Sequence, residues 1–514
     1  MIARRGERRV REGHMESRHA FDLVIRGGTV YDGTGSAGTM GDVAVRGDRI
    51  VEIGHVTARG ARELDAAGLA VAPGFIDVHS HDDFAVLLEP LMPFKVMQGV
   101  TTDVGGNCGS GVVPFEAGLI RFRRMHPDAD PKPWDGFGGY LERVDEARPS
   151  VNVAVLMGHG SLRRGAIGIE QRRPTTDELE TMKGWVREGV SAGAVGLSTG
   201  LIYEPGRYAA TDEIVALARE LGGPSGGLYA THMRNEADGL LDAVREAIAI
   251  GEGAGVPVQI SHHKASGRRN WGRVRESLAL IDEARARGVD VTADQYPYTA
   301  GSTSLAAVIQ NGAFRSDSPG GLGQLAGEHV LIASAPGHPE WEGQTLASLA
   351  GRWNLDAGSA AERVVATVGD ACFVITFTMD ETDVRTVMAH PTTMIGSDGV
   401  PTGGKPHPRL YGCFARVLGH YVREQRVLKL ATAIHRMTGM PAAKFQLTGR
   451  GVVRGGAFAD LVVFDPATIA DVATYEEPRR FPAGIRAVYV NGVEVARNGA
   501  HTGARPGRAV RRGR

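Results

Sequence analysis

The stretch GFIDVHSH at residues 74–81 decides the fold, because it is a short apolar run that ends in a pair of histidines. Seven further runs have the same form, and most are separated by stretches with helical periodicity. Apolar runs that alternate with helices and lack strict alternation indicate buried parallel strands. Eight such units predict a (β/α)8 barrel of the TIM type. The other seven are VTTDVGGNC at 100–108, VNVAVLMGH at 151–159, AVGLST at 194–199, LYATHMR at 228–234, VPVQISHHK at 256–264, VDVTADQYPY at 289–298 and TTMIGSDG at 392–399.

The two ends of the chain have a different pattern. Residues 21–72 alternate short strands with glycine turns, and residues 448–500 repeat this style and include an Asn491-Gly492 pair, which is a hairpin signal. We expect these two segments to form one small β-sandwich together. The α/β barrel, residues 73–447, is then inserted between them.

Two strand-like segments exceed the eight that the barrel needs. They are VLIASA at 330–335 and FVITF at 373–377, and we assign them to an insertion at about residues 300–390. Residues 1–20 are basic, with Met15 as a second potential start, and are predicted to be a disordered tail. Residues 501–514 are predicted to be a C-terminal tail.

The composition excludes several classes of protein. The 514 residues are 42% hydrophobic and 23% charged, with a formal net charge of −1, which argues against nucleic acid or a membrane surface as a partner. No window approaches the roughly 18 apolar residues of a membrane span, and the basic head lacks the apolar core of a secretory signal. Three cysteines fit a reducing compartment, so we expect a cytoplasmic protein. The oligomeric state is left open.

Potential metal ligands stand at the carboxyl ends of five of the eight predicted strands, where a TIM barrel forms its active site. In His-x-His the two side chains point to the same side of an extended chain. Imidazole, thiolate and carboxylate are the ligands that zinc prefers. A lone cysteine after a turn is more often a small buried residue, and a lone histidine is more often a hydrogen-bonded core residue, so the joint pattern carries the prediction. The candidates are His79, His81, Cys108, His232, His262 and Asp398.

The motifs that carry these residues resemble those of the N-acyl-D-amino-acid deacylases, or D-aminoacylases, of the amidohydrolase superfamily. The resemblance runs from about residue 21 to 510. The cysteine of GGNCG distinguishes this group from dihydroorotases and hydantoinases, which bridge two metals with a carboxylated lysine. The motifs are GFIDVHSHDD, GVTTDVGGNCG, GLSTGLIYEPGRYA, THMRNE, ISHHK, DQYPYTAGST, MIGSDG, PHPRLYG, RMTGMPAAKFQL and GAFADLVVFDP.

The resemblance implies which candidates hold the metal. Cys108, His232 and His262 would bind one tightly held zinc ion, and His79, His81 and Asp398 would form a second, weaker or vacant site. Whether one or two metals act stays open. The resemblance also implies that Asp398 serves in catalysis. Asp398 would take a proton from the attacking water and deliver it to the departing amine.

The substrate contacts follow from the same resemblance and from the chemistry of the α-carboxylate, which needs cationic or hydroxyl donors. The candidates are Lys264, Arg409, Tyr203, Tyr298 and Ser302. Each tyrosine has a structural alternative, and the two cations could be plain surface charges. Preference for D-amino acids rests on the resemblance alone, and the acyl group and amino acid are not predicted.

The chain departs from the family at about 305–320, where AAVIQNGAF replaces an expected segment with proline and tryptophan, so the substrate is put in doubt. His159 ends the third run, and a structural role is favoured for it. Asp82 and Asp83 follow His-x-His and are candidates to hydrogen-bond the ligand imidazoles, or else solvated loop acids.

Two alternatives to a deacylase remain. A cyclic amidase of the hydantoinase or dihydroorotase type would share the barrel but would give Cys108 no role. A barrel that serves as an inactive scaffold would be expected to lose metal ligands, whereas this chain keeps every candidate.

Overall fold

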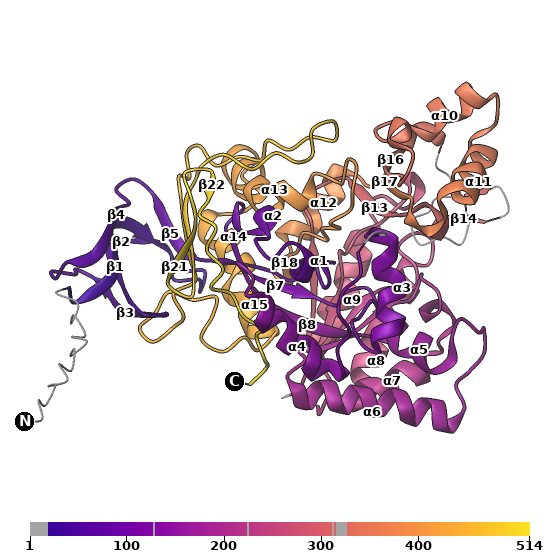
Figure 1. Ribbon diagram of the computed structural model, residues 1–514, viewed down its shortest axis with the longest axis horizontal. Coiled ribbons are helices and arrows are strands. Elements are labelled where there is room, and N and C mark those ends of the chain that lie inside the picture. The colour runs from indigo at the N-terminus through magenta and orange to yellow at the C-terminus, as the bar shows by residue number, and fades with distance from the viewer. Residues whose placement is uncertain (1–18, 127–128, 224–225, 311–312, 315–325, 514) are drawn as a thin grey trace, which may run out of the picture.

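The computed structural model describes residues 19–126, 129–223, 226–310, 313–314 and 326–513. Figure 1 shows three parts: a β domain built from both chain ends, a central barrel, and a unit that projects from the opposite side of the barrel. The predicted tail at residues 1–20 lies outside the described residues except for its last two. Within the described ranges, no helix combines the length and the apolar character needed to cross a bilayer.

Eight parallel strands form the barrel sheet, and each of the eight predicted runs overlaps one of them. Their order in the sheet follows the chain. The first and last strands meet just beyond their ends, where the Asp398 amide donates to the His79 carbonyl at 2.8 Å and Ser80 bridges to Gly399. The (β/α)8 prediction is therefore confirmed. The strands are β6 (Phe75–Asp77), β7 (Val100–Gly105), β8 (Asn152–Gly158), β9 (Gly196–Gly200), β10 (Leu228–His232), β11 (Val258–Ile260), β12 (Val291–Gln295) and β18 (Thr393–Ile395).

Helices follow the strands and cover the outside of the barrel (Figure 1). A capping box begins α6: Thr175 Oγ1 accepts from the Glu178 amide at 3.3 Å, and Glu178 Oε2 accepts from the Thr175 amide at 2.7 Å. The principal helices are α1 (Ala85–Leu88), α2 (Pro93–Val96), α3 (Phe115–Met125), α4 (Gly136–Ala147), α5 (His159–Ile167), α6 (Thr176–Ala192), α7 (Thr211–Arg219), α8 (Leu240–Ala254), α9 (Val274–Ala286), α12 (Glu381–Ala389), α13 (Arg409–Arg416), α14 (Leu430–Met437) and α15 (Gly439–Lys444).

The two chain ends form one small β domain, as predicted. Its strands make one continuous mixed sheet, and residues of β2 and β20, which are not neighbours in that sheet, share one buried cluster. Asn491 and Gly492, both at positive φ, connect β20 to β21, and this confirms the hairpin signal. The strands are β1 (Phe21–Val30), β2 (Thr39–Arg46), β3 (Arg49–Gly54), β4 (Gly60–Asp65), β5 (Ala70–Pro73), β19 (Leu461–Phe464), β20 (Ile485–Val490), β21 (Val493–Arg497) and β22 (Ala500–His501).

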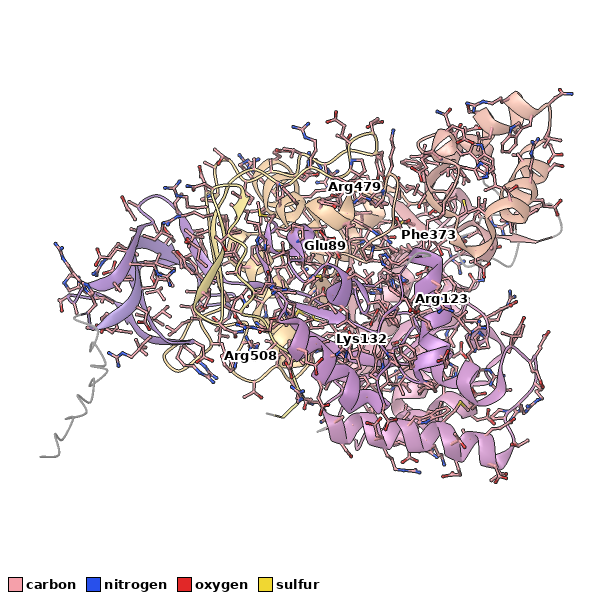
Figure 2. All side chains as sticks on the ribbon, in the orientation of Figure 1. Glu89, Arg123, Lys132, Phe373, Arg479 and Arg508 are labelled. Carbon is pink, nitrogen blue, oxygen red and sulfur yellow. The ribbon has the colours of Figure 1, made fainter. Side chains whose placement is uncertain are left out.

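The two surplus segments lie outside the barrel, as the sequence indicated. They are β16 (Val330–Ser334) and β17 (Phe373–Phe377), which pair with β13 (Ala300–Ser304) in a separate antiparallel sheet. Figure 2 labels Phe373 where this projecting unit meets the barrel. The unit also contains the short hairpin of β14 (Ile309–Gln310) and β15 (Ala313–Phe314), together with α10 (Leu346–Trp353) and α11 (Ala357–Val368).

The last residues of the chain are paired with the barrel. The Val153 amide donates to the Arg508 carbonyl at 2.9 Å, and the Val510 amide donates to the Val153 carbonyl at 2.7 Å. This segment therefore adds a short parallel contact beside β8. The division of the chain at residues 72, 447 and 500 stays a prediction.

Candidate metal centre

The six predicted ligand-type side chains come from five strand ends and gather at the barrel mouth. His79 and His81 follow β6, Cys108 follows β7, and His232 is the last residue of β10. All six side chains are buried. The parallel order of the strands brings these distant sequence positions to one place.

His262 and Cys108 lie at the middle of the group. His262 Nε2 is 3.6 Å from Cys108 Sγ and 2.9 Å from His232 Nδ1, and Cys108 Sγ is 3.3 Å from His79 Nε2. On the other side of His79, Asp398 Oδ1 lies 3.4 Å from His79 Nε2 and 3.1 Å from His81 Nε2. The two predicted ligand sets are therefore neighbours, with His79 in contact with both.

This geometry and donor chemistry fit a metal. One ligand atom from each of His79, Cys108 and His262 falls within 4.8 Å of the others, and the same holds for His79, His81 and Asp398. Nitrogen, thiolate sulfur and carboxylate oxygen form a donor set typical of zinc. How the six side chains divide between two metal sites stays a prediction.

Three of the six candidates have an unusual backbone. Cys108, His262 and Asp398 adopt positive φ angles of 53°, 36° and 49°. Residues other than glycine rarely adopt this left-handed backbone conformation. Those that do cluster at functional sites, where the surrounding structure holds the backbone in this conformation. The backbone thus marks the same residues that the chemistry does.

Two carboxylates that the sequence analysis missed orient the ligand imidazoles. Asp294 Oδ1, at the end of β12, lies 3.1 Å from His79 Nδ1 and accepts from the His262 amide at 2.8 Å. Glu236 Oε1 lies 2.9 Å from His262 Nδ1. A carboxylate on Nδ1 leaves Nε2 directed at the metal position. Both residues stand in quoted motifs, DQYPY and THMRNE, so their place at strand ends was an available signal.

Burial and charge set the protonation of these groups. Burial lowers the pKa of His232 and His262 well below the usual value, so both imidazoles are neutral, the form that binds a metal. Burial alone would raise the pKa of Asp398, but the Arg409 guanidinium and the nearby imidazoles hold it well below its usual range. Asp398 is therefore ionised. For His79, burial acts to lower the pKa, but Cys108 and two aspartates raise it well above its usual value.

Asp82 and Asp83 are both buried, so neither is a solvated loop acid. Asp82 Oδ2 lies 2.9 Å from Lys95 Nζ, and the Asp83 side chain packs against Gly105. His159 has the structural role that was favoured: its Nε2 lies 2.9 Å from Glu213 Oε1.

Five of the six side chains, all but His79, line a cavity with a volume of about 710 Å³ including its open mouth. Lys264 lines it, with Nζ 2.6 Å from Glu236 Oε1. Arg409 borders it: NH1 lies 2.9 Å from Asp398 Oδ2 and NH2 donates to the Ser302 carbonyl at 3.4 Å. Other lining residues are His81, Cys108, Ile202, Tyr203, His232, His262, Tyr296, Ser302, Thr303, Ala307, Val308, Phe373, Thr376, Thr378, Asp398 and Val400.

Tyr298 is the predicted substrate residue that the structure places elsewhere. Its ring packs against His407 at 5.1 Å and under Arg416 at 4.9 Å, whereas Tyr296 lines the cavity. The Tyr298 amide donates to the Tyr296 carbonyl at 3.0 Å, so the chain makes a tight turn here. Two-residue periodicity fails in such a turn, and Tyr298 does not share the face of Tyr296.

Comparisons with known proteins agree with this geometry. A family model described as "Amidohydrolase family" matches residues 62–306 and 279–496. A D-aminoacylase of Alcaligenes xylosoxydans xylosoxydans is 43% identical over 506 residues, covering 96% of this chain and 98% of the relative. The chain belongs to the D-aminoacylase family of amidohydrolases.

Solved structures of D-aminoacylase family members extend the comparison to the metal centre. N-acyl-D-glutamate deacylase of Bordetella bronchiseptica, in complex with zinc and a phosphonate that mimics the tetrahedral intermediate, has a TM-score of 0.87 and 41% identity, covering 96% of this chain and 99% of that one. A D-aminoacylase with a binuclear metal centre, described as having one-metal activation and second-metal attenuation, has a TM-score of 0.85 and 41% identity, covering 96% of this chain and all of that one.

Proposed function

We propose that this protein hydrolyses the amide bond of N-acyl-D-amino acids, giving a carboxylate and a free D-amino acid, with zinc as its metal. The observation that carries the proposal is the barrel mouth itself, where five of the six metal-ligand side chains line a cavity together with Lys264, and Arg409 pairs with Asp398 beside it. Similarity to deacylases over almost the whole chain supports the same activity.

Cys108, His232 and His262 would hold the working zinc, and His79, His81 and Asp398 would offer a second, weaker site. Zinc bound there would polarise the amide carbonyl and make hydroxide available near neutral pH. Asp294 and Glu236 would keep the imidazoles of His79 and His262 in position through their Nδ1 atoms.

Asp398 is the proposed proton carrier. Its carboxylate is ionised, it faces the cavity, and it lies beside the ligand imidazoles. It would take a proton from the attacking water and then deliver that proton to the amine nitrogen. An amine leaves readily only when protonated, so one carboxylate acting first as base and then as acid meets both needs.

Lys264 and Arg409 are the proposed partners of the substrate α-carboxylate, helped by the hydroxyls of Ser302 and Tyr203. Each cation is already balanced by a carboxylate, Glu236 for Lys264 and Asp398 for Arg409. These ion pairs hold both cations at the cavity edge with fixed geometry. A substrate carboxylate then meets donors that need no reordering.

The amino-acid side chain would meet a wall with apolar groups and few cations. Among the described lining residues, Ile202, Val308, Phe373 and Val400 are large and apolar, and Lys264 is the lysine or arginine that lines the cavity. A second substrate carboxylate would have no cation of its own there and would lose its hydration. This wall favours uncharged D-amino acids over acidic ones.

A substrate panel tests the proposal. We expect zinc-loaded protein to release amine from N-acetyl-D-methionine or N-acetyl-D-leucine and to leave the L-enantiomers intact, with lower kcat/KM for N-acetyl-D-glutamate. Turnover of a hydantoin, without turnover of any N-acyl amino acid, would instead make the protein a cyclic amidase. Zinc-free protein with no turnover of either class would favour the scaffold alternative.

A further inference from the structure

A second pocket adjoins the metal-centre cavity, and no step of the proposed reaction uses it. Both cavities are lined by Cys108, Tyr203, Thr303 and Phe373. The second has a volume of about 680 Å³ including its open mouth, within the usual range for ligand pockets. The Tyr203 hydroxyl lies 3.1 Å from Thr303 Oγ1, and both residues line the two cavities.

The floor of this pocket is backbone. Gly109, Gly160, Gly200 and Gly206 line it, and a Cβ atom added to any of the four would come within 3.0 Å of a neighbouring backbone atom. No side chain can therefore grow from these positions into the pocket without moving the loops that carry Cys108. The floor therefore carries no side chains at these four positions, and it adjoins Cys108, a candidate metal ligand.

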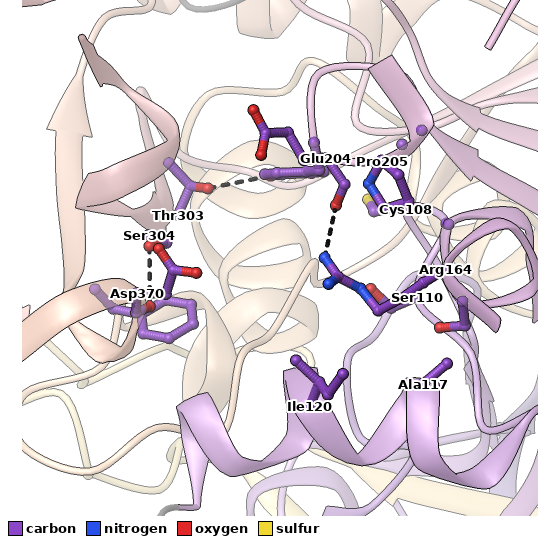
Figure 3. Close-up of a pocket in the computed structure, with 17 residues that line it drawn as sticks. Cys108, Ser110, Ala117, Ile120, Arg164, Glu204, Pro205, Thr303, Ser304 and Asp370 are labelled. Carbon is purple, nitrogen blue, oxygen red and sulfur yellow. Dashed lines mark hydrogen bonds between the residues drawn. The ribbon is translucent and has the colours of Figure 1, made fainter. Parts of the chain in front are cut away.

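The side walls of the pocket combine apolar groups with charged ones. Ile120 projects from α3 toward the pocket (Figure 3), and Phe373 lines both this pocket and the metal-centre cavity. Arg164 also points in, and its NH2 donates to the Glu204 carbonyl at 3.4 Å. The carboxylates of Glu204 and Asp370 line the same pocket, so acidic groups outnumber the one arginine among the described lining residues.

The chemistry of the proposed substrate needs a second compartment. The carbonyl carbon of an N-acyl amino acid bears the oxygen, the amine half and the acyl chain. The amine half, with its α-carboxylate, is directed to Lys264 and Arg409 in the metal-centre cavity. The acyl chain must then leave the metal position in another direction, and the second pocket opens there at Cys108.

We propose that the pocket between α3, α5 and the Tyr203–Gly206 loop is an acyl-chain site that accepts uncharged acyl groups longer than acetyl. This inference rests on the proposed function. An aliphatic chain would lie along the glycine floor between Ile120 and Phe373. A chain that ends in a carboxylate would meet Glu204 and Asp370 and would be disfavoured.

The test compares N-acetyl-, N-hexanoyl- and N-adipoyl-D-leucine. The wild-type protein is expected to hydrolyse the hexanoyl substrate at least as well as the acetyl one, and the adipoyl substrate more slowly. Ile120→Trp places a bulky ring in the pocket from a half-exposed position on α3. We expect the hexanoyl-to-acetyl ratio of kcat/KM to fall about tenfold or more in this variant.

Two further variants separate pocket from cavity. Ile169→Trp makes the same change at an exposed isoleucine that lines neither pocket, and should leave the acyl ratio unchanged. Ala307→Trp, in the metal-centre cavity, should alter the preference for the amino-acid side chain but not the acyl ratio. Inhibition by hexanoate relative to acetate gives a second readout, and Ile120→Trp should abolish the advantage of hexanoate.

Several results would overturn the acyl-chain site. These are a wild-type protein that accepts acetyl but not hexanoyl substrates, an acyl ratio that Ile120→Trp leaves unchanged, and a ratio that shifts equally in Ala307→Trp. In each case turnover of N-acetyl-D-leucine would leave the proposed function standing. Loss of turnover on all three substrates in the wild type would overturn both.

Discussion

Two clusters of buried ionisable side chains lie near the β6 strand end, and they differ in the residues that build them. One is the metal centre. The other has Lys95 at its middle, with Nζ 2.5 Å from Asp77, 2.9 Å from Asp82 and 3.1 Å from Asp103. Burial lowers the pKa of Lys95, but the three aspartates raise it well above its usual value, so the lysine is charged.

The difference between the clusters is what they face. None of the four residues of the Lys95 cluster lines the metal-centre cavity or the acyl pocket, and a lysine supplies the cation. The metal centre directs its donor atoms at a cavity, and the cations beside it, Lys264 and Arg409, pair with Glu236 and Asp398. Asp77 connects the two clusters, because its Oδ1 accepts from the amides of His79 and Ser397. The Lys95 cluster thus holds in place the backbone that carries His79 of the metal centre.

The largest effect that would sharpen this comparison is a loss of activity, and it is expected at the metal centre. Asp398→Asn removes the proton acceptor but nearly preserves shape, so kcat/KM should fall by about 10²–10⁴, while zinc stays bound at the Cys108 site. Kinetics and elemental analysis measure the two quantities. Asp383→Asn is the control, because Asp383 is also buried but accepts from the Gly272 amide away from the cavity. A wild-type rate in Asp398→Asn would remove Asp398 from the mechanism.

Substitutions in the Lys95 cluster should lower the stability of the protein instead. Lys95→Met leaves three buried carboxylates without their cation, and the free energy of unfolding should fall by about 3–5 kcal/mol. Urea unfolding measures the loss. Lys183→Met provides the contrast, because Lys183 pairs with Glu180 at the surface and should contribute less than about 1 kcal/mol. Equal losses in the two variants would contradict a special role for the Lys95 cluster.

The smallest expected effect is a loss of zinc affinity when Asp294, the carboxylate that contacts His79 Nδ1, is replaced. Asp294→Asn weakens the support of His79, and zinc affinity should fall by about 10–100-fold. Competition with a chelator reports the affinity. Asp282→Asn is a matched change at an exposed His–Asp pair, Asp282 with His390, and should leave affinity unchanged. If the two variants bind zinc equally, Asp294 does not act on the metal centre.

The sequence predicted the features that depend on local order. Eight apolar runs became eight barrel strands, and His-x-His placed His79 and His81 next to one carboxylate of Asp398, because strand direction and two-residue alternation are local properties. Because all the candidate ligands stand at the ends of barrel strands, the sequence also predicted that Cys108 would lie beside His262. A single cysteine, taken alone, gives little indication of a metal site.

The remaining features depend on contacts between distant segments. Tyr298 was expected to contact the substrate from the family resemblance, but the tight turn after Tyr296, which has no clear sequence signature, directs its ring elsewhere. Asp294 and Glu236 act through hydrogen bonds that cross between strands. Lys95, on the short helix α2, looks like an ordinary charged residue until the fold places three aspartates around it.

The left-handed backbone at Cys108, His262 and Asp398 has a consequence for protein engineering. Each such residue costs about 1–3 kcal/mol in conformational strain, and glycine would relieve it at a smaller entropic cost of roughly 0.5–1 kcal/mol. A selection for heat resistance alone would therefore favour glycine at the three positions that the reaction needs most. Thermostable variants of this enzyme should be sought under a simultaneous requirement for turnover.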